Sequence, residues 1–505
     1  MKQRKNHIPW YILFGFPYVA GTAFIVLCSW YHKTYEVGFK ELLYTLLGPL
    51  EGAGNSVIRL VINSFVPPFF LAVLALILLG FLFSETRLNL LLWEKILHRA
   101  FPYRIMTKLR RLGALACTGV FIFSLFYMNE KFDVLTYLHS LSQKTLIYET
   151  EYVDPADVAI TAPERKRNLI YIYLESMETT YMSAEEGGAQ ETNLLPKLTA
   201  LAQDNLHFAG TDSFSGMQSL TGLNWTMASL LGHTAGIPFA FPVEGNAMDT
   251  QNQFAPRMTN LGDILQANGY TQEFLCGSDA SYAGRRKYFT QHGDYQIYDL
   301  FTARENGIID NDYYVWWGFE DRILFDIARS EATRLAQGDQ PFNLTLLTVD
   351  LHHLGGYICD QCGDTYDGST SDVVLCTDQL VSDFVSWCQN QPFWENTTLM
   401  ITGDHPRMDT LLVDNVAATQ RTLYNCILNE DASLESATEN RLFTALDMFP
   451  TTLAALGFDI EGDRLGLGVN LFSDQPTLAE RIGLADFELE LNKESTFYLN
   501  KFFYK

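Results

Sequence analysis

The stretch that decides the fold is Asn168-Leu-Ile-Tyr-Ile-Tyr-Leu-Glu-Ser176. Its apolar run is uninterrupted and ends in a carboxylate and a hydroxyl. A short apolar run bounded by polar residues is typical of a buried strand in a parallel sheet. The same form recurs at residues 342–349 and 398–402. These three runs predict three buried parallel strands.

Helical patterns separate these runs, at residues 258–268, 321–336 and 377–389. Alternating strands and helices predict an α/β fold with a mainly parallel sheet flanked by helices. In such sheets the carboxyl ends of the strands face the ligand crevice. Polar residues follow the three runs at this edge, namely Glu175, His352, Asp404 and His405. We therefore expect a site there.

Carboxylates and an imidazole are suitable ligands for a divalent cation, and a hydroxyl nucleophile would complete a catalytic site. Thr221 precedes a helical pattern within residues 219–231, where backbone N–H groups favour a phosphate. Simpler interpretations stay open: Thr221 as a helix N-cap, and Glu175 as a solvated charge. Asp404 and His405 are harder to dismiss, because polar groups at a buried strand end need partners.

The net charge of −24 is unevenly distributed. Residues 1–128 carry 13 Lys and Arg against 5 Asp and Glu, and the remainder carries 22 against 54. The acidic part repels polyanions, which makes nucleic acid an unsuitable partner. The chain therefore combines two physically different parts.

Three uncharged stretches predict membrane spans, at about residues 10–31, 65–84 and 112–128. Lysine and arginine precede the first span and fill the loop between the second and third, which predicts that both segments are cytoplasmic. Residues 1–128 then form a multi-pass anchor in the cytoplasmic (inner) membrane. We expect a linker at 129–167, an extracytoplasmic catalytic domain at 168–480 and a C-terminal tail at 481–505. Aromatic and basic residues in this tail fit either the membrane interface or the domain surface equally well.

With these residues, the chain resembles the membrane-anchored phosphoglycerol transferases of the alkaline phosphatase/sulfatase superfamily. This group contains the glucan phosphoglycerol transferases and the lipoteichoic acid synthases. The segments that carry the resemblance are residues 168–181, Thr221-Gly-Leu-Asn-Trp-Thr226, Gly236-Ile-Pro238, Ala283-Gly-Arg285, His292-Gly293, Trp317-Gly-Phe-Glu-Asp321, Thr348-Val-Asp-Leu-His-His353 and Gly403-Asp-His405. Their order and spacing make the resemblance specific.

The resemblance implies Mn²⁺ or Mg²⁺, with Zn²⁺ as a further option, bound by Glu175, Thr221, Asp404 and His405. It implies that Thr221 attacks phosphatidylglycerol, releases diacylglycerol and carries glycerophosphate as a covalent intermediate. A glycan or a glycerol-phosphate chain is the implied acceptor.

The resemblance also assigns substrate contacts. His352 matches a histidine that contacts the phosphate or serves the leaving and entering oxygens. Arg285 matches a basic residue that binds the headgroup, and His353 is a second phosphate contact. A tryptophan found near this arginine in the synthases is absent, and residues 282–284 stand in its place.

One alternative is excluded and two stay open. A sulfatase requires a Cys or Ser in a C/S-x-P-x-R motif, which this sequence lacks. A phosphoethanolamine transferase, or a related phosphodiesterase or hydrolase of the same fold, is the nearer alternative. A catalytically silent, membrane-tethered binding domain is an alternative of a different class.

Four cysteines follow the histidine pair: Cys359, Cys362, Cys376 and Cys388. An extracytoplasmic compartment allows thiols to oxidise. We expect at least one disulfide, most plausibly between Cys376 and either Cys359 or Cys362.

Overall fold

The computed structural model describes residues 10–34, 39, 42–43, 55–82, 95, 103–241, 252–414, 416–417 and 420–504. The chain divides into two compact units. One comprises Met1–Leu42 and Asn55–Leu138, and the other comprises Leu43–Gly54 and His139–Lys505. Each unit is described by itself.

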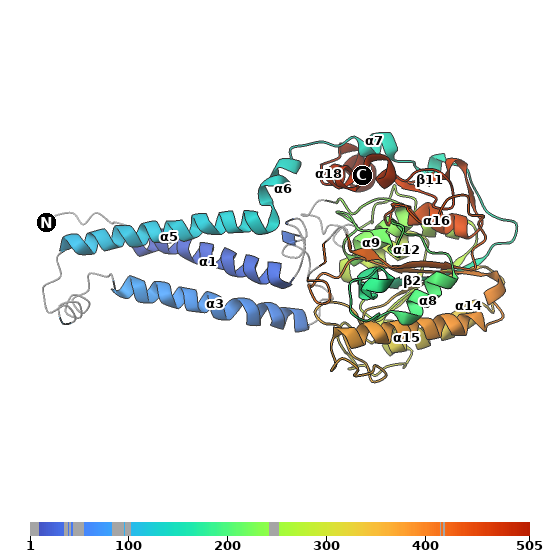
Figure 1. Cartoon of the computed structure of the whole chain (residues 1–505), viewed down its shortest axis with the longest axis horizontal. Coiled ribbons are helices and arrows are strands. Elements are labelled where there is room, and N and C mark those ends of the chain that lie inside the picture. The colour runs from blue at the N-terminus through green and yellow to red at the C-terminus, as the bar shows by residue number, and fades with distance from the viewer. Residues whose placement is uncertain are drawn as a thin grey trace. The chain divides into compact units, whose positions relative to one another are not determined.

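The first unit contains three long helices, α1 (Trp10–Thr34), α3 (Asn55–Leu82) and α5 (Tyr103–Phe132) (Figure 1). They include the predicted spans at 10–31 and 112–128, and residues 65–82 of the span at 65–84. Within the described residues, one helical segment, Arg111–Phe132, is long and apolar enough to cross a membrane, and Ile62–Ala75 is a shorter apolar stretch. Among the charged segments that predict the orientation, residues 1–9, 83–94 and 96–102 lie outside the described residues. The three-span anchor thus stays a prediction.

A six-stranded sheet organises the second unit, in the order β5-β4-β6-β2-β7-β9. Its strands are β2 (Asn168–Leu174), β4 (Thr271–Cys276), β5 (Gln296–Tyr298), β6 (Phe342–Leu347), β7 (Thr397–Gly403) and β9 (Asn425–Leu428). All neighbours are parallel except β7 and β9. The mainly parallel α/β fold is confirmed, and the three apolar runs form the adjacent central strands β6, β2 and β7.

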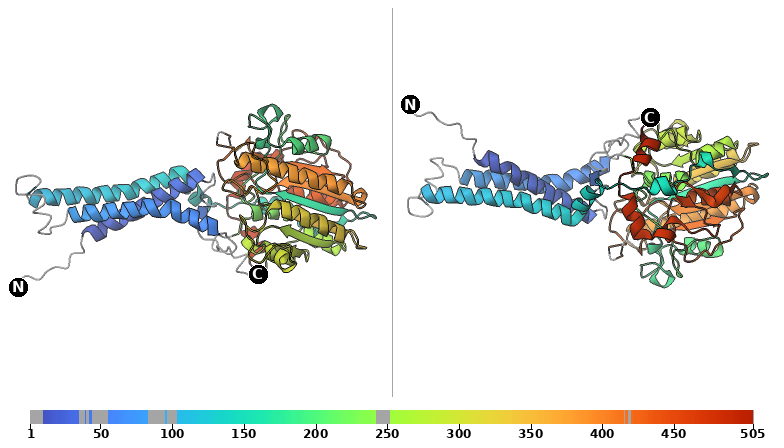
Figure 2. Two further views of the ribbon diagram at one scale, coloured as in Figure 1. Left: turned by 90° about the horizontal axis from the view of Figure 1, so that it is seen from below. Right: turned by 90° about the horizontal axis from the view of Figure 1, so that it is seen from above.

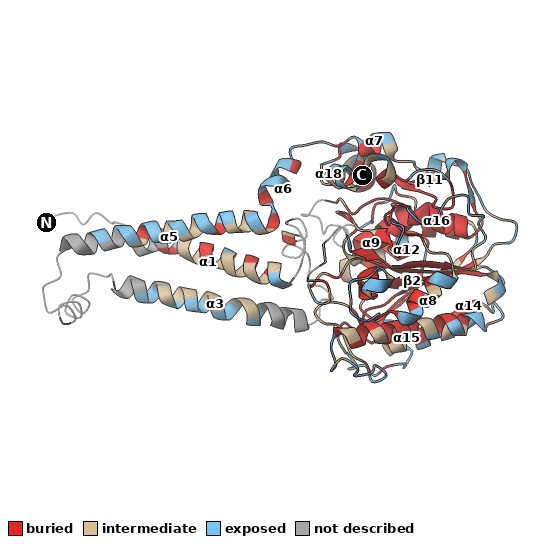
Figure 3. Cartoon of the chain, in the orientation of Figure 1, coloured by how far each residue is buried: buried red, intermediate tan, exposed pale blue. Residues whose placement is uncertain are grey.

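The central strands are buried on both faces, as their continuous apolar sequences predict (Figure 3). Along β2, Leu169, Tyr171 and Tyr173 belong to one hydrophobic core, whereas Ile170, Ile172 and Leu174 belong to the other. This alternation follows from the two-residue period of a strand.

Helices cover both faces of this sheet (Figure 1). The first core contains residues of α9 (Thr226–Ala235), α11 (Leu261–Ala267), α12 (Arg285–Gln291) and α16 (Met448–Ala455). The second contains residues of α8 (Pro196–Asp204), α14 (Asp321–Leu335) and α15 (Thr370–Gln389). The result is a three-layer domain whose site must lie at a strand edge.

Much of the predicted linker belongs to the catalytic unit. Helix α7 (Ile147–Glu151) buries Ile147 and Tyr148 in the first core, and β1 (Ile160–Thr161) pairs with β10 (Asp459–Ile460). The hydrophobic residues in this segment are sufficient to pack it onto the domain, so it is a structured part rather than a spacer.

The C-terminal tail also packs on the domain. It forms α17 (Leu478–Ile482), α18 (Leu484–Leu491), α19 (Thr496–Tyr498) and a final turn at Leu499–Phe503, drawn in red in Figure 2. Phe487, Leu491, Tyr498 and Phe502 are buried in the first core. Of the two interpretations of its aromatic residues, the structure supports packing on the domain surface.

A disulfide joins Cys362 to Cys376, which confirms one of the two expected pairings. It ties the loop that follows the histidine pair to α15. Cys359 keeps its thiol, with its Sγ 3.5 Å from Cys362 Sγ and 3.9 Å from Cys376 Sγ.

Candidate active site

The site begins with the pairing of β2 and β7. These strands run parallel with Leu174 opposite Gly403, so the next residues, Glu175 and Asp404, leave the sheet side by side. The N–H of Asp404 donates to the carbonyl of Leu174 at 3.0 Å and fixes this exit. The parallel register therefore brings together two carboxylates separated by more than two hundred residues in the chain.

His405 completes a buried cluster with these carboxylates. Its Nε2 lies 3.4 Å from Glu175 Oε1 and 3.4 Å from Asp404 Oδ2. The ligand atoms of Glu175, Asp404 and His405 all lie within 4.8 Å of one another. None of the three residues is more than 2% exposed.

A threonine adjoins this cluster, and it is Thr226, the first residue of α9. Its Oγ1 lies 3.2 Å from His405 Nε2 and 3.4 Å from Glu175 Oε2. One turn later, the hydroxyl of Ser229 donates to the backbone carbonyl of Asp404. This contact pins the start of α9 against the loop that carries two of the cluster's residues.

Hydrogen bonds to the other atoms of these side chains orient them. His405 Nδ1 lies 2.8 Å from the carbonyl of Pro406, so Nδ1–H donates there and Nε2 keeps a lone pair toward the cluster. Asp404 Oδ1 accepts from the N–H groups of Ser176 and His405, at 2.8 and 2.7 Å. Asp404 Oδ2 is buried and has no hydrogen-bond partner among the described residues.

The spacing of these atoms fits a bound cation. Ligands at about 2.1 Å from a tetrahedral metal ion are separated from one another by about 3.4 Å. The four separations among Glu175, Asp404, His405 and Thr226 given above are 3.2 to 3.4 Å. Two buried carboxylates, one oriented imidazole nitrogen and one hydroxyl form a donor set that suits Mn²⁺, Mg²⁺ or Zn²⁺.

The pKa shifts of these side chains also indicate that the cluster suits a bound positive charge. Burial, together with the Glu175 carboxylate, raises the pKa of Asp404 to about 7. Burial also opposes ionisation of Glu175, but His352 and His405 hold the pKa of this carboxyl below its usual value. For His405, burial lowers the pKa, and Asp404 and Glu175 more than reverse this, so the net shift is upward. Two adjacent buried carboxylates are costly without a cation between them.

The structure does not bring Thr221 to this cluster. The backbone N–H of Thr221 donates to Glu488 Oε2 at 2.8 Å, and its hydroxyl donates to Glu488 Oε1. The expectation of Thr221 as a ligand and nucleophile therefore needs correction, and Thr226 has the required position. The physical reason is that α9 begins five residues after Thr221, following an extended Trp225.

A sequence signal for Thr226 exists in retrospect. The buried helical run starts at Met227, so the residue at the helix start is the threonine before it. Trp225 packs on Phe239, with ring centroids 4.8 Å apart, and this contact sets the point where the loop turns into the helix. That contact joins residues on the two sides of α9.

A chain of aromatic contacts connects His352 to Arg285. The His352 ring is 4.4 Å from the ring of Trp317, which is 5.6 Å from that of Tyr282, and the Arg285 guanidinium lies 5.7 Å from the Tyr282 ring centre. Arg285 is buried and donates to Ser278 Oγ and to the carbonyls of Asp279 and Tyr282. Sequence analysis did not identify Trp317 as part of the site.

The two histidine rings lie close together and are tilted relative to each other. The rings of His352 and His353 are 4.2 Å apart, and His352 Nδ1 lies 3.0 Å from the carbonyl of His353. Nδ1–H therefore donates to that carbonyl, and Nε2 remains for exchange of a proton. Burial lowers the pKa of both histidines, although Glu175 partly opposes this for His352. Both are thus mainly neutral near pH 7.

Arg407 is a further residue that sequence analysis missed. It is fully buried, pairs with Asp409 and donates to the carbonyl of Leu351 at 3.1 Å. Its backbone N–H donates to Glu178 Oε1 at 2.7 Å. Arg407 thereby ties together the loops that follow β2, β6 and β7, which carry the site residues.

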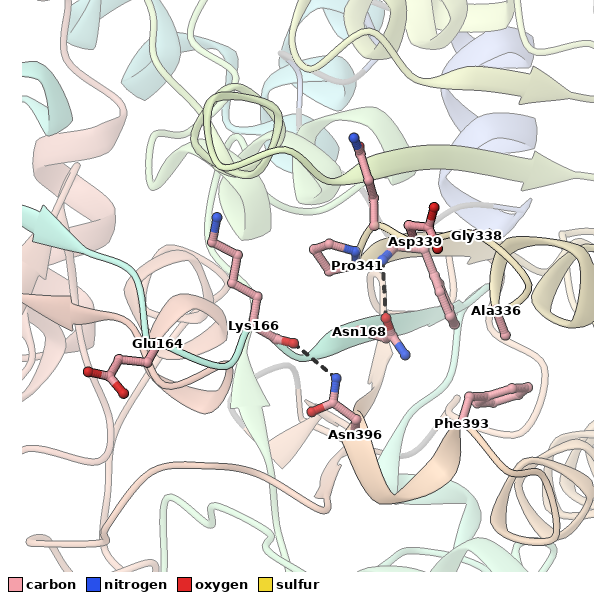
Figure 4. Close-up of a pocket in the computed structure, with 11 residues that line it drawn as sticks. Glu164, Lys166, Asn168, Ala336, Gly338, Asp339, Pro341, Phe393 and Asn396 are labelled. Atoms are coloured by element: carbon pink, nitrogen blue, oxygen red, sulfur yellow. Dashed lines mark hydrogen bonds between the residues drawn. The ribbon is translucent and has the colours of Figure 1, made fainter.

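A cavity of about 440 Å³ lies at the other edge of the sheet, at the amino ends of the strands (Figure 4). Its polar groups join strand starts: Asn168 Oδ1 accepts from the N–H of Phe342 at 3.2 Å, and Asn396 Nδ2 donates to the carbonyl of Lys166 at 2.9 Å. The cluster of Glu175, Asp404, His405 and Thr226 lies at the opposite edge, which is the candidate active site.

Comparison with known proteins gives a family for this domain. The sulfatase family profile matches residues 167–458. Phosphoglycerol transferase I of Xanthomonas axonopodis pv. citri is 30% identical over 360 residues, which cover 68% of this chain and 49% of the relative. Phosphoglycerol transferase I of Salmonella choleraesuis is 31% identical over 330 residues, covering 64% and 41% respectively. The chain spans about half the length or less of these curated relatives.

Among solved structures, the lipoteichoic acid synthase LtaP from Listeria monocytogenes matches with a TM-score of 0.47 and 17% sequence identity. The match covers 63% of this chain and 79% of that one.

Proposed function

Because this chain belongs to the sulfatase family, we propose that it is a metal-dependent phosphoglycerol transferase that acts at the cytoplasmic membrane. The observation that carries the proposal is the position of the Thr226 hydroxyl, 3.2 Å from His405 Nε2 and 3.4 Å from Glu175 Oε2 at the start of a buried helix. Relatives named phosphoglycerol transferase support the type of group transferred. Hydrolysis of sulfate esters is disfavoured, because the sequence lacks the C/S-x-P-x-R motif.

Glu175, Asp404, His405 and Thr226 would hold one divalent cation. When bound, this cation lowers the pKa of the threonine hydroxyl and neutralises charge on the phosphoryl oxygens. The chain itself contributes orientation: Pro406 fixes the His405 ring, and Ser229 fixes the start of α9. The helix start adds backbone N–H groups that favour a phosphate.

In the first half-reaction, Thr226 Oγ1 forms a bond to the phosphorus of phosphatidylglycerol. The bond from phosphorus to the diacylglycerol oxygen breaks, and the proton lost by Thr226 ends on that oxygen. In the second half-reaction, an acceptor hydroxyl attacks phosphorus, and Thr226 regains a proton. His352, neutral and with a free Nε2, is suited to carry the proton in both steps. The acceptor is a glycan or a glycerol-phosphate chain.

Arg285, His352 and His353 would bind the phosphoglycerol headgroup. Arg285 is held by three hydrogen bonds, so its charge is fixed in place before the substrate arrives. Trp317 and Tyr282 supply flat apolar walls beside this charge, of a kind that suits the carbon face of glycerol. Trp317 comes from a different part of the chain than residues 282–284, which stand in the place of the synthases' tryptophan.

The test uses the full-length protein in vesicles of phosphatidylglycerol labelled in its glycerol headgroup, with Mn²⁺. We expect diacylglycerol release and a covalent glycerophosphoryl group that fragment-ion mass spectrometry maps to Thr226 rather than to Thr221. Thr226→Val should abolish both signals and Thr226→Ser should retain part of them. Vesicles of phosphatidylethanolamine test the alternative donor. A label on Thr221, or full activity of Thr226→Val, would overturn the assignment.

A further inference from the structure

We propose that Glu488, in the C-terminal segment, is a positioning residue for transfer: it holds the loop that leads into Thr226. The inference rests on the proposed function, because it takes Thr226 as the nucleophile. Glu488 lies on α18, beyond residue 458, where the match to the sulfatase family ends. This chain thus uses a segment outside the matched domain to arrange the catalytic threonine.

The contact between Glu488 and Thr221 uses both carboxylate oxygens. Oε2 accepts from the backbone N–H of Thr221 at 2.8 Å, and Oε1 accepts from its hydroxyl. Asn492, the residue that caps the end of α18, donates from Nδ2 to Glu488 Oε1 at 3.1 Å and to Thr221 Oγ1 at 3.2 Å. A bidentate, charge-assisted contact of this kind fixes direction as well as distance.

Other contacts hold α18 in place independently of Glu488. Phe487 and Leu491, on either side of it, are buried in the core. Glu490 Oε2 accepts from the hydroxyl of Thr145 at 2.5 Å, on the segment that precedes the catalytic domain. The helix therefore offers a fixed point against which the loop at Thr221 is held.

The same C-terminal segment also holds the other side of α9. The hydroxyl of Tyr498 donates to the carbonyl of Pro238 at 2.7 Å and accepts from the N–H of Ala240 at 3.3 Å. Thr221 precedes α9 and Pro238 follows it. Hydrogen bonds from the C-terminal segment therefore hold the residues on both sides of the helix that begins with Thr226.

The loop between Thr221 and Thr226 is short and tightly folded. The N–H of Phe239 donates to the carbonyl of Gly222 at 2.8 Å, which joins the two flanks of α9 directly. Gly222 has a φ of +78°, and a Cβ there would lie 3.0 Å from Pro238 Cβ, so this turn requires glycine. A displacement of Thr221 should therefore also displace Thr226, because the loop between them is too tightly folded to adjust.

Group transfer is sensitive to such displacements. Misplacing a reacting group by about 1 Å costs about 100-fold in rate. We expect Glu488→Ala to lower kcat for diacylglycerol release by about 10- to 100-fold with little change in KM, because the headgroup contacts at Arg285 and His352 stay in place. Mn²⁺ affinity should change much less than kcat, since the hydrogen bonds and ion pairs given above for Glu175, Asp404 and His405 do not involve α18.

The matched control is Glu490→Ala. Glu490 lies two residues away on the same helix and also loses contacts, to Thr145 and Lys493, but it does not touch the Thr221 loop. Glu488→Gln is the conservative variant, because its amide still offers one acceptor to the Thr221 N–H and one donor to the hydroxyl oxygen. Each full-length protein is assayed on phosphatidylglycerol vesicles for kcat, KM, Mn²⁺ binding and apparent Tm.

The proposal predicts a loss of kcat in Glu488→Ala, substantial rescue in Glu488→Gln, and near-normal kcat in Glu490→Ala at a similar loss of Tm. Thr221→Val combined with Glu488→Ala should lower kcat by less than the product of the single effects, because both remove one contact. Normal kcat in Glu488→Ala, or an equal loss of kcat in the Glu490→Ala control, would overturn the proposal. If Thr226→Val retains activity, the proposed function fails. If Thr226→Val is inactive but Glu488→Ala keeps normal kcat, the nucleophile assignment stands and this inference fails.

Discussion

Asp321 and Asp350 each accept a hydrogen bond from the other's backbone N–H. Asp321 Oδ2 accepts from Asp350 N at 3.0 Å, and Asp350 Oδ2 accepts from Asp321 N at 3.1 Å. Asp321 Oδ1 also accepts from Val349 N at 2.7 Å. This reciprocal pair joins the first turn of α14 to the loop after β6, two residues before His352. The buried pair therefore fixes where the histidines leave the sheet.

Asp321→Asn should lower both stability and activity. The amide retains one acceptor oxygen, so one of the two backbone N–H groups loses its partner in a buried place, at a cost of about 1–3 kcal/mol. We expect a lower apparent Tm and a fall in kcat through displacement of His352, with Mn²⁺ binding retained. Asp326→Asn, an exposed change on the same helix, is the control. Unchanged Tm in Asp321→Asn would contradict the structural role.

The cation-binding prediction concerns His405. Mn²⁺ that binds only the folded protein stabilises it by about 2.7 kcal/mol at a free concentration 100 times Kd. We expect Mn²⁺ to raise the apparent Tm of the parent protein, EDTA to reverse this, and His405→Gln to abolish the response. His292→Gln removes a buried histidine that contacts Asp263 and Phe254 instead, so it should keep the response to Mn²⁺. A metal response that survives in His405→Gln would rule out this ligand set.

The positions of Glu175, Asp404 and His405 were predictable because parallel strands end at one edge, and their apolar runs are easily recognised. The position of Thr221 away from this cluster was not predictable. Its partner, Glu488, is 267 residues away along the chain, and no local pattern encodes such a contact. The start of α9 depends in turn on Trp225 packing against Phe239, a tertiary contact that overrides the helix start expected from Thr221 alone.

The segment expected to be a linker packs on the domain, and so does the tail, for which two interpretations were equally open. The linker is charged and turn-prone, which hides the few hydrophobic residues that dock it, whereas the aromatic residues of the tail suit a membrane interface as well as a protein surface. Tyr148 from the first and Tyr498 from the second pack edge to face, with ring centroids 5.1 Å apart. Mutual burial of two distant segments leaves no periodic signal in either one.

The third prediction concerns the cysteine cluster. In Cys376→Ser, Cys362 loses its partner, but Cys359 Sγ lies 3.5 Å from Cys362 Sγ, so we expect a Cys359–Cys362 disulfide to form in its place. Non-reducing peptide mapping detects the change of partner. Cys359→Ser with Cys376→Ser should leave Cys362 as a free thiol and lower stability by about 3 kcal/mol, the usual effect of opening a loop of this size. Failure to find a Cys359–Cys362 peptide in oxidised Cys376→Ser would refute the exchange of partners.

The fourth prediction concerns pH. Burial, together with repulsion from Glu331, raises the pKa of Glu273 from 4.5 to about 7, although Arg334 partly opposes the shift. A carboxyl whose pKa is higher in the folded state binds its proton more tightly there, so its contribution to stability is present below pH 4.5 and is lost as the pH rises to about 7. Glu273→Gln removes this dependence. Relative to the parent, the variant should therefore gain on the order of 2 kcal/mol between pH 5 and pH 8. A difference in apparent Tm between the two proteins that stays constant over this range would count against it.

The last prediction concerns the segment between the helix α5 and the catalytic sheet. Residues 139–164 contribute Ile147 and Tyr148 to the core, the β1–β10 pair, and the edge-to-face contact of Tyr148 with Tyr498. A truncated chain that begins at His139 should fold, bind Mn²⁺ and cleave a soluble glycerophosphodiester. One that begins at Arg165 should lose stability. Because Tyr498, which holds the flank of α9 at Pro238, loses its contact with Tyr148, this chain should also lose a larger share of its kcat than of its metal affinity.

The lipid donor adds a further difference: phosphatidylglycerol keeps its acyl chains in the membrane, so the chain that begins at His139 should turn over vesicle-bound lipid much more slowly than the full-length protein does. Circular dichroism, Mn²⁺ titration and the two activity assays separate these effects. Equal stability of the two truncated chains would show that residues 139–164 do not support the domain, and equal rates on vesicles for the full-length and His139 chains would show that the N-terminal helices do not assist access to the lipid.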